Sequence, residues 1–366
     1  MRIGIAGWFG SDNLGDEVLL ATTLDLITEF CQPCCVMVLS ANPSRVSELH
    51  AAPALALSPP GYLAKMRALP AMYRELRRLD VLVIGPGTVF QERAPNLRWP
   101  GTLPLFLRLC LLARLAGRPV VLFGAAVREE TTALGRVTLR IIGRCAASIG
   151  ARDQVSAGLL SSGAQVIGDV AAAWRPSVRG THQVQRFAVS LKPLPSSLNA
   201  QVLSAVSETI SDLTVAGLAG DFVAVARGRG AVGEDDRTVW QTQFSAVLRL
   251  IEVPLERVLH PEDEWISILG SYQIVIAARL HTALLALKFA TPIVAIAHEE
   301  KLSRSLTALG LGGFVWTPGM PNQTLIRMVQ QAQVDRTPFL AARNLLTGSG
   351  DRARGFLHDA LAEIGS

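Results

Sequence analysis

The sequence has no uninterrupted apolar run long enough to cross a bilayer, and its start lacks the pattern of a secretory leader. The longest apolar stretch, residues 103–115, is interrupted by Arg108 and Arg114, whereas a spanning helix needs about 20 predominantly apolar residues. Met1-Arg2 runs directly into an apolar strand pattern with no cleavage site. We therefore expect a cytoplasmic protein without a transmembrane segment or a signal peptide.

Cysteine is scarce, and the few cysteines are not spaced as a metal site requires. Three of the five form a C-x-x-C-C cluster with no second ligand pair nearby in the sequence, although a structural zinc site uses four ligands. Partly buried, reduced thiols explain this cluster. We expect neither a metal nor a cofactor. The five cysteines are Cys31, Cys34, Cys35, Cys110 and Cys145.

Blocks of basic residues are also missing. The chain has 35 Lys and Arg against 30 Asp and Glu, a net charge of +5, but its arginines are scattered rather than interleaved with aromatic residues. We therefore expect no nucleic-acid partner, and an anionic small molecule or an anionic membrane surface agrees better with this charge. Residues 63–78 place five basic residues among apolar ones. We interpret this segment as an ordinary surface helix, with a peripheral membrane patch as the alternative.

Short apolar strands that alternate with helical patterns are abundant. Hydrophobic residues make up 49% of the sequence. The length of 366 residues predicts two domains. The alternation is typical of doubly wound parallel sheets, and an aperiodic stretch rich in Pro, Gly and polar residues marks a linker. We predict an α/β protein with two Rossmann-like domains facing a cleft, the GT-B layout. The predicted segments are residues 1–173, the linker 174–185, residues 186–335, and a helical segment, 336–366, that packs back on the first domain.

Residues 274–298 carry the clearest candidate site. A strand pattern, Ile274–Ile276, is followed by a turn with Arg279 and His281, a helical run, and a second buried strand. In parallel sheets, ligands bind outside the carboxyl ends of the strands. Arg279 and His281 both lie between the end of a strand and the start of a helix. A cation and an imidazole at a helix N-terminus predict an anionic ligand there.

Glycines or charged residues also follow four strands in the first half of the chain. Asp16 and Glu17 stand at the start of a predicted helix, where carboxylates either interact favourably with the helix dipole or act on a substrate. Both interpretations remain open from the residues alone. The four strand ends are Gly7–Gly15, Gly85–Gly87, Gly124 and Arg152-Asp153.

Short motifs occur in a fixed order from near the start of the chain to about Leu311. They are Gly7-Trp8-Phe9-Gly10 with Asn13-Leu14-Gly15-Asp16-Glu17, Gly85-Pro86-Gly87 with Gln91, Ala151-Arg152-Asp153 with Ser156, Gly168-Asp169, Ser190-Leu191-Lys192, Arg279-Leu280-His281, and Pro292–Ala297 with Lys301. In this order they resemble the polysaccharide pyruvyl transferase family. The resemblance implies a cytoplasmic enzyme that moves the enolpyruvyl unit of phosphoenolpyruvate onto two hydroxyls of a sugar and releases phosphate.

The resemblance also implies roles for individual residues, with Arg152, His281 and Lys301 in donor binding and catalysis. Ketal formation needs a group that exchanges protons near neutral pH, for which we predict His281, and a pocket of cations for the two anionic groups of the donor. Either Asp16 or Glu17 would deprotonate or bind the acceptor. The predicted catalytic residues are His281, Arg152 and Asp16, and the predicted substrate-binding residues are Arg279, Lys301, Lys192, Asn13, Glu17, Gly85 and Gly87.

The chain departs from the family pattern in three places. Gly85-Pro86-Gly87 replaces a three-glycine turn, Lys192 replaces an arginine, and His298-Glu299-Glu300 precedes Lys301 in place of a Tyr-Asp-type run. These departures leave room for a non-catalytic sugar-binding relative.

A GT-B glycosyltransferase that uses a nucleotide sugar is the other alternative, and residues 262–264 would supply its ribose-binding acid. For the pyruvyl transferase, the acceptor would be lipid-linked or nucleotide-linked. Lipid linkage would explain the basic segment 63–78 and would place the enzyme at the inner face of the membrane.

Overall fold

The computed structural model describes most of the chain as two compact units. The first unit comprises Met1–Ser11, Asp16–Trp174 and Ser349–Ser366, and the second comprises Asp12–Gly15 and Arg175–Gly348. Of the predicted linker, residues 176–183 lie outside the described residues, as do residues 63–67 of the basic segment and the acidic residues 262–264. The described residues are 1–57, 68–92, 101–128, 131–175, 184–227, 235–253, 255 and 267–365.

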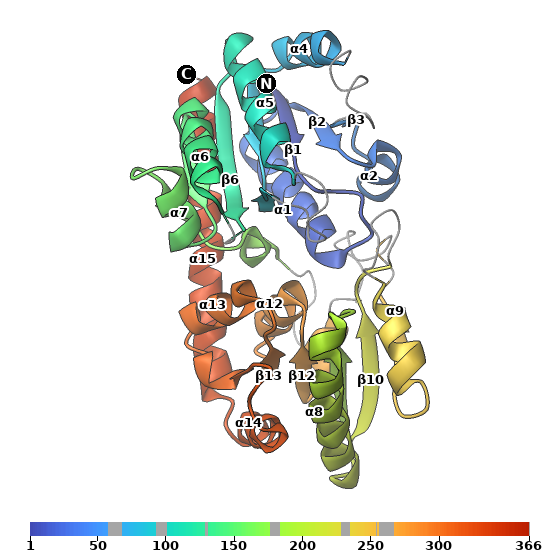
Figure 1. The fold of residues 1–366 in the computed structure, drawn as a ribbon. Coiled ribbons are helices and arrows are strands. Elements are labelled where there is room, and N and C mark those ends of the chain that lie inside the picture. The colour runs from blue at the N-terminus through green and yellow to red at the C-terminus, as the bar shows by residue number, and fades with distance from the viewer. Residues whose placement is uncertain are drawn as a thin grey trace. The chain divides into compact units, whose positions relative to one another are not determined.

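The first unit is built on a parallel sheet whose central strands are buried (Figure 1). Its order is β3-β2-β1-β4-β6-β7-β8, and β5 pairs with β6. The order reverses between β1 and β4, which is where doubly wound sheets bind ligands. The strands are β1 (Arg2–Ala6), β2 (Cys35–Ser40), β3 (Ala54–Ala56), β4 (Val81–Ile84), β5 (Gly87–Phe90), β6 (Val120–Val127), β7 (Ser148–Ala151) and β8 (Gln165–Val166).

Helices cover both faces of this sheet, and several begin at a side-chain cap. Thr132 accepts from the amide of Gly135 at 3.2 Å and Asp153 from the amide of Ser156 at 2.8 Å, which satisfies amides that have no partner within the helix. The helices are α1 (Leu14–Phe30), α2 (Pro43–His50), α4 (Leu69–Arg77), α5 (Leu103–Leu115), α6 (Ala133–Cys145), α7 (Gln154–Leu160), the 3-10 turn η1 (Val170–Ala173) and the second half of α15 (Thr337–Gly365).

The second unit repeats the same topology. Its sheet is again parallel, with the order β11-β10-β9-β12-β13-β14, and the order reverses between β9 and β12. The prediction of an α/β protein with two Rossmann-like sheets is confirmed. The strands are β9 (Arg186–Ser190), β10 (Ala219–Ala224), β11 (Arg249–Glu252), β12 (Ile274–Ala277), β13 (Ile293–Ile296) and β14 (Val315–Trp316).

One predicted helix of the second unit is wrong. We expect a helix over residues 235–249, but the structure has a single turn, α9 (Asp236–Val239), a π-helical turn, η2 (Trp240–Phe244), and then β11. The remaining helices are α8 (Ser196–Val215), α11 (Ser267–Ser271), α12 (Leu280–Lys288), α13 (Glu300–Ala308), the 3-10 turn η3 (Gly312–Phe314), α14 (Asn322–Val334) and the first half of α15.

A buried carboxylate links three strands of this sheet through side-chain hydrogen bonds. Asp221 in β10 is fully buried, and its oxygens accept from the guanidinium groups of Arg186 in β9 and Arg249 in β11 and from the Tyr272 hydroxyl at 3.0 Å. Burial alone would raise the pKa of Asp221, but these hydrogen bonds hold it below its usual value. The edge strand β11 is therefore attached by side chains as well as by its backbone.

Candidate functional site

The reversal point of the second sheet brings together two of the family motifs. Ser190 ends β9, and its carbonyl accepts from the amide of Ala278, directly after β12, at 2.8 Å. The hydroxyls of Ser190 and Thr282 lie 3.3 Å apart. Helix α12 begins at Leu280, immediately after Arg279. Its first amides and the residues after both strands therefore lie at the edge where parallel sheets bind anionic ligands.

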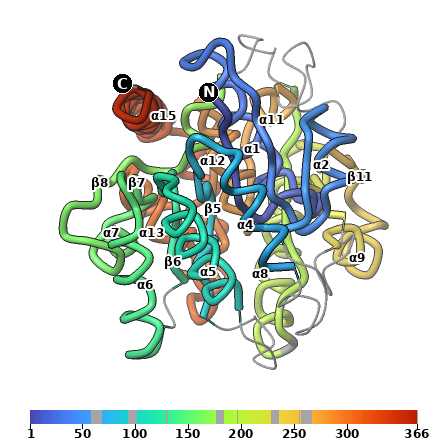
Figure 2. Tube along the Cα trace, turned by 90° about the horizontal axis from the view of Figure 1, so that it is seen from above, coloured from blue at the N-terminus to red at the C-terminus, as the bar shows by residue number. Residues whose placement is uncertain are grey.

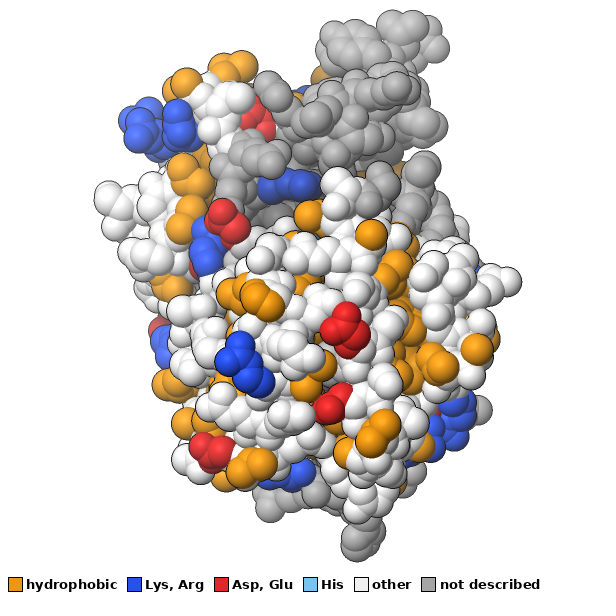
Figure 3. Space-filling model, turned by 60° about the horizontal axis from the view of Figure 1, so that its bottom comes forward, with side chains coloured by type: hydrophobic (Ala, Val, Ile, Leu, Met, Phe, Trp, Pro, Cys, Tyr) orange, Lys and Arg blue, Asp and Glu red, His pale blue; other side chains and the backbone are white. Residues whose placement is uncertain are grey.

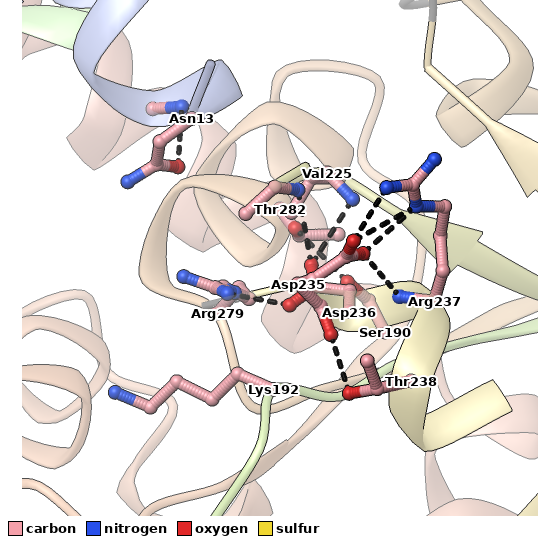
Figure 4. A network of polar contacts seen from close by, with 12 residues as sticks. Asn13, Ser190, Lys192, Val225, Asp235, Asp236, Arg237, Thr238, Arg279 and Thr282 are labelled. Carbon is pink, nitrogen blue, oxygen red and sulfur yellow. Dashed lines mark hydrogen bonds and ion pairs between the residues drawn. The ribbon is translucent and has the colours of Figure 1, made fainter. Parts of the chain in front are cut away.

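Arg279 is held in this edge by a buried aspartate (Figure 4). The guanidinium Nη2 donates to Oδ1 of Asp236 at 2.5 Å, and Oδ2 of Asp236 accepts from the amides of Val225 and Ala226 at 3.1 Å each. Burial raises the pKa of Asp236, an effect that Arg279 and the two amides oppose. Because Asp236 is fixed by two backbone bonds, it sets the position of the guanidinium.

The loop Asp12–Gly15, early in the sequence, is part of the same site. The amide of Leu14 donates to the carbonyl of Val225 at 2.9 Å, and Asn13 pairs with Ala226 across an antiparallel bridge. A Cβ atom on Gly15 would lie 1.9 Å from Nδ1 of His281, so only glycine allows the loop to pack against this imidazole. The motif N-L-G therefore shapes the surroundings of His281.

Two lysines share one carboxylate beside this edge. Nζ of Lys192 lies 2.5 Å from Oε1 of Glu299, and Nζ of Lys301 lies 2.8 Å from Oε2. Burial lowers the pKa of Lys192, and the positive charges of Lys301 and Arg279 add to this effect, while Glu299 opposes it. Burial would raise the pKa of Glu299, but the hydrogen bond from His298 and the two lysines hold it far below its usual range.

The two acidic residues at the start of α1 have different environments. Glu17 is fully buried, and its carboxylate accepts from the amides of Gly10 at 2.9 Å and Ser11 at 3.1 Å and contacts Nε2 of His50 at 2.9 Å. These contacts hold the glycine-rich loop in shape. Asp16 is half-buried, and its Oδ2 accepts from the Ser11 hydroxyl at 3.3 Å.

The other predicted residues of the first unit follow β4 and β7. Gly85 adopts a φ of 113° and Gly87 a φ of 103°, a region that favours glycine, and a Cβ on Gly85 would lie 2.2 Å from the Phe123 carbonyl oxygen. Arg152 is 8% exposed, and its Nη1 donates to the Thr88 hydroxyl at 3.3 Å. Its Nε lies 3.5 Å from the carboxylate of the adjacent Asp153.

The structure thus divides the predicted site residues between the units. Asn13, Lys192, Arg279, His281 and Lys301 belong to the second unit, and Asp16, Glu17, Gly85, Gly87 and Arg152 belong to the first.

Asp236 and Glu299 hold the cations of the second unit and are not among the predicted site residues. The sequence pointed indirectly to Glu299, because Glu299 is one of the three residues before Lys301 that differ from the family pattern. Asp236 had none, since its partner lies 43 residues away. In the described part of the chain, no group of three His, Cys, Asp or Glu side chains could hold a metal ion, and no helix is long and apolar enough to cross a membrane.

Solved structures similar to this chain define its class. A putative UDP-N-acetylglucosamine 2-epimerase from Listeria monocytogenes has a TM-score of 0.63 at 12% identity and covers 97% of this chain and 94% of its own. Anabaena Alr3699/HepE in complex with UDP has a TM-score of 0.61 at 13% identity, covering 99% and 100%. The spinosyn rhamnosyltransferase SpnG has a TM-score of 0.54 at 13% identity, covering 100% of both chains. The fold is therefore GT-B-like, as predicted.

The family is shown by sequence. A family model described as "Polysaccharide pyruvyl transferase" matches residues 13–300, and the chain belongs to this family. Membership indicates a transferase that acts in polysaccharide biosynthesis. No curated protein sequence matches the chain significantly.

Proposed function

We propose that this protein transfers the enolpyruvyl group of phosphoenolpyruvate onto two hydroxyls of a hexose in a glycan precursor, forming a pyruvate ketal and releasing phosphate. The observation that carries the proposal is the gathering of Lys192, Arg279 and Lys301 with His281 at the reversal point of the second sheet. Family membership supports the same reaction class.

The cations of this edge match the two anionic groups of the donor. Phosphoenolpyruvate carries a carboxylate and a phosphate on one small frame, so its pocket needs several positive groups. Arg279 offers a planar fork for bidentate binding, and Lys192 and Lys301 supply point charges. An incoming phosphate would share the two ammonium groups with Glu299. The N-terminus of α12 adds backbone donors.

The reaction begins with proton transfer to carbon. His281, as imidazolium, donates a proton to the vinyl methylene, which becomes a methyl group and leaves an oxocarbenium-like centre at the neighbouring carbon. The first sugar hydroxyl attacks this carbon and gives up its proton to a base. The carbon–oxygen bond to phosphate then breaks, and the second hydroxyl closes the ring and releases its proton. A positioned acid/base group typically contributes about 10²–10⁴-fold.

We extend the proposal to the first unit on the family resemblance. Arg152 would bind the donor, and Asp16 would accept the proton of the acceptor hydroxyl. Asn13, Glu17, Gly85 and Gly87 would bind substrate, and Glu17 would also hold the loop at Gly10 and Ser11 through their amides. The acceptor would be a hexose carried on a lipid or a nucleotide.

Phosphate release from phosphoenolpyruvate, measured with a panel of nucleotide-linked and lipid-linked hexoses, tests the proposal. We expect release that requires one acceptor, a product with the mass of an added pyruvyl group, and loss of both in His281→Ala. The matched control is His358→Ala, because the side chain of His358 is 58% exposed and lies in the first unit. Failure to bind or turn over phosphoenolpyruvate, together with thermal protection by a nucleotide sugar, would favour a glycosyltransferase instead.

A further inference from the structure

Helices α5 and α6 form an exposed surface of the first unit that carries large apolar side chains. The two helices lie side by side (Figures 1 and 2). Right-handed crossovers place them on the face of the sheet opposite α1 and α2, so their outer sides face solvent. The exposed apolar side chains are Leu111 (47% exposed) and Leu115 (74%) on α5 and Leu134 (74%), Val137 (52%) and Ile141 (37%) on α6. We call this the α5–α6 surface.

The apolar stripe of α6 lies on its flank nearer α5. A Cβ atom on Gly143 of α6 would lie 2.2 Å from the Leu160 carbonyl oxygen of α7, so that flank of α6 faces α7. At 100° per residue, Leu134 and Ile141 lie on the opposite flank, which is the side of α5. Helix α5 adds the exposed Leu111 and Leu115 to this surface.

The two helices themselves carry charge of a single sign. Residues 103–118 and 133–146, all of which the structure describes, contain six arginines and no aspartate or glutamate. Helix α4 adjoins α5, and Nη2 of Arg118 donates to the Arg77 carbonyl at 2.8 Å. Of the described acidic residues nearby, Glu75 is bonded to Arg78 and Glu92 to Thr132. The six arginines are Arg108, Arg114, Arg118, Arg136, Arg140 and Arg144.

Another face of the molecule has a different character. On the face drawn in Figure 3, basic and acidic side chains both appear, scattered among apolar and uncharged ones. Helices α5 and α6 differ from that face because their described residues include arginines and no acidic side chains.

We propose that the α5–α6 surface docks onto an anionic lipid bilayer. Exposed leucine and isoleucine side chains suit the boundary between headgroups and acyl chains, and arginine forms strong bonds with lipid phosphates. Charge complementarity selects this partner over a second copy of the chain, because self-association would bring the arginines of both copies together, and the described residues of α5 and α6 offer no acidic partner. The docking is independent of the catalytic proposal, although a lipid-linked acceptor would be presented at such a bilayer.

Co-sedimentation of the full chain with vesicles tests the docking. The probes are vesicles of phosphatidylcholine alone and of phosphatidylcholine with about a third phosphatidylglycerol, a fraction that gives a strongly negative surface. We expect binding to the anionic vesicles at low salt and its loss as salt rises, because the Debye length falls to about 3 Å at 1 M. Neutral vesicles should bind weakly.

Two double variants separate the two contributions. Arg140→Gln with Arg144→Gln, both exposed, should lower the partition coefficient about fivefold for each arginine, since each basic group near an anionic leaflet contributes about 1 kcal/mol. The matched control is Arg327→Gln with Arg352→Gln, both exposed in the second half of the chain.

Leu111→Ser with Leu115→Ser should lower the partition coefficient by a similar factor or more for each leucine, because 47% of Leu111 and 74% of Leu115 are exposed and available for burial. Its control is Leu340→Ser with Leu345→Ser, which are 45% and 52% exposed.

The docking is supported if anionic vesicles retain the wild type and both control variants but not the two surface variants. The surface variants must also keep the circular dichroism spectrum of the wild type. Three results would overturn the docking: no retention of wild type at low salt, equal losses in the control variants, or dimerisation of wild type through this surface without vesicle binding. The assay needs no substrate, so its failure is distinguishable from failure of the proposed reaction.

Discussion

Replacing Glu299 with glutamine should lower the pKa of Lys192 and so destabilise its protonated form. The carboxylate lies 2.5 Å from the Lys192 ammonium and 2.8 Å from that of Lys301. Lys192 is only 12% exposed, and burial together with neighbouring positive charges already lowers its pKa. Glu299→Gln keeps the shape of the side chain and removes a negative charge that opposes this shift, so the pKa of Lys192 should fall further.

The structure sets the size of the effect. A hydrogen bond to a charged group contributes about 1.5–3 kcal/mol when shielded, but Glu299 is 34% exposed and Lys301 is 40% exposed, so the Lys301 contact is discounted to about 0.5 kcal/mol. The contact with Lys192 then dominates at about 1.5 kcal/mol. At a pH above the pKa of Lys192, this free energy corresponds to a roughly tenfold smaller fraction of protonated Lys192 in the variant.

The measurements are the pH profile of kcat/KM for phosphoenolpyruvate and the NMR titration of the lysine Nζ. In Glu299→Gln, the alkaline limb should begin at lower pH and kcat/KM there should fall about tenfold, and Nζ of Lys192 should titrate earlier. Glu300→Gln is the matched control, because Glu300 is adjacent and exposed. Identical Lys192 titrations in wild type and Glu299→Gln would refute the reasoning.

Three further predictions concern single contacts. Asp236→Asn should cost about 3 kcal/mol in urea unfolding, because it leaves a buried guanidinium without its carboxylate. Gly15→Ala should reduce turnover about 100-fold by displacing the His281 imidazole, whereas Gly158→Ala, with nothing within 4 Å of the added carbon, should not. The pKa of Asp221 is lowered, so the stability that it contributes is present above its unfolded pKa, near 3.9, and is lost as pH falls through the folded pKa. Asp221→Asn should flatten that acid limb in thermal unfolding.

Each of these three has a contrary result. An Asp236→Asn variant that unfolds at the wild-type urea concentration would show that the buried pair adds no stability. Equal turnover in the Gly15→Ala and Gly158→Ala variants would show that the close approach to the imidazole has no consequence. An acid limb unchanged in Asp221→Asn would assign acid unfolding to other carboxylates.

Elements buried on both faces were predictable from the sequence. The predicted strand Ile274–Ile276 appears as β12 (Ile274–Ala277), and the predicted second strand of that unit as β13 (Ile293–Ile296), because continuous apolar runs leave few alternatives. The edge strand β11 was not predicted. β11 (Arg249–Glu252) has charged residues at both ends and only half-buried residues between them, so its pattern resembles the end of a helix.

The cations of the site were predictable, but their anchors were not. Arg279 and His281 follow an apolar strand directly, which is a local signal. The pairing of Lys192 with Glu299 joins residues 107 positions apart, and only the order of the sheet brings them together. The packing of the loop Asp12–Gly15 against Val225 and Ala226 is likewise a tertiary feature, to which no local pattern points.

The most direct test of the proposed reaction is pyruvyl transfer carried out in heavy water, with the product analysed by mass spectrometry and NMR. Protonation of the vinyl methylene should place deuterium in the methyl group of the ketal, and His281→Ala should form no product while His358→Ala does. Products without deuterium in that methyl group, full activity in His281→Ala, or no pyruvyl group on any acceptor would contradict the account.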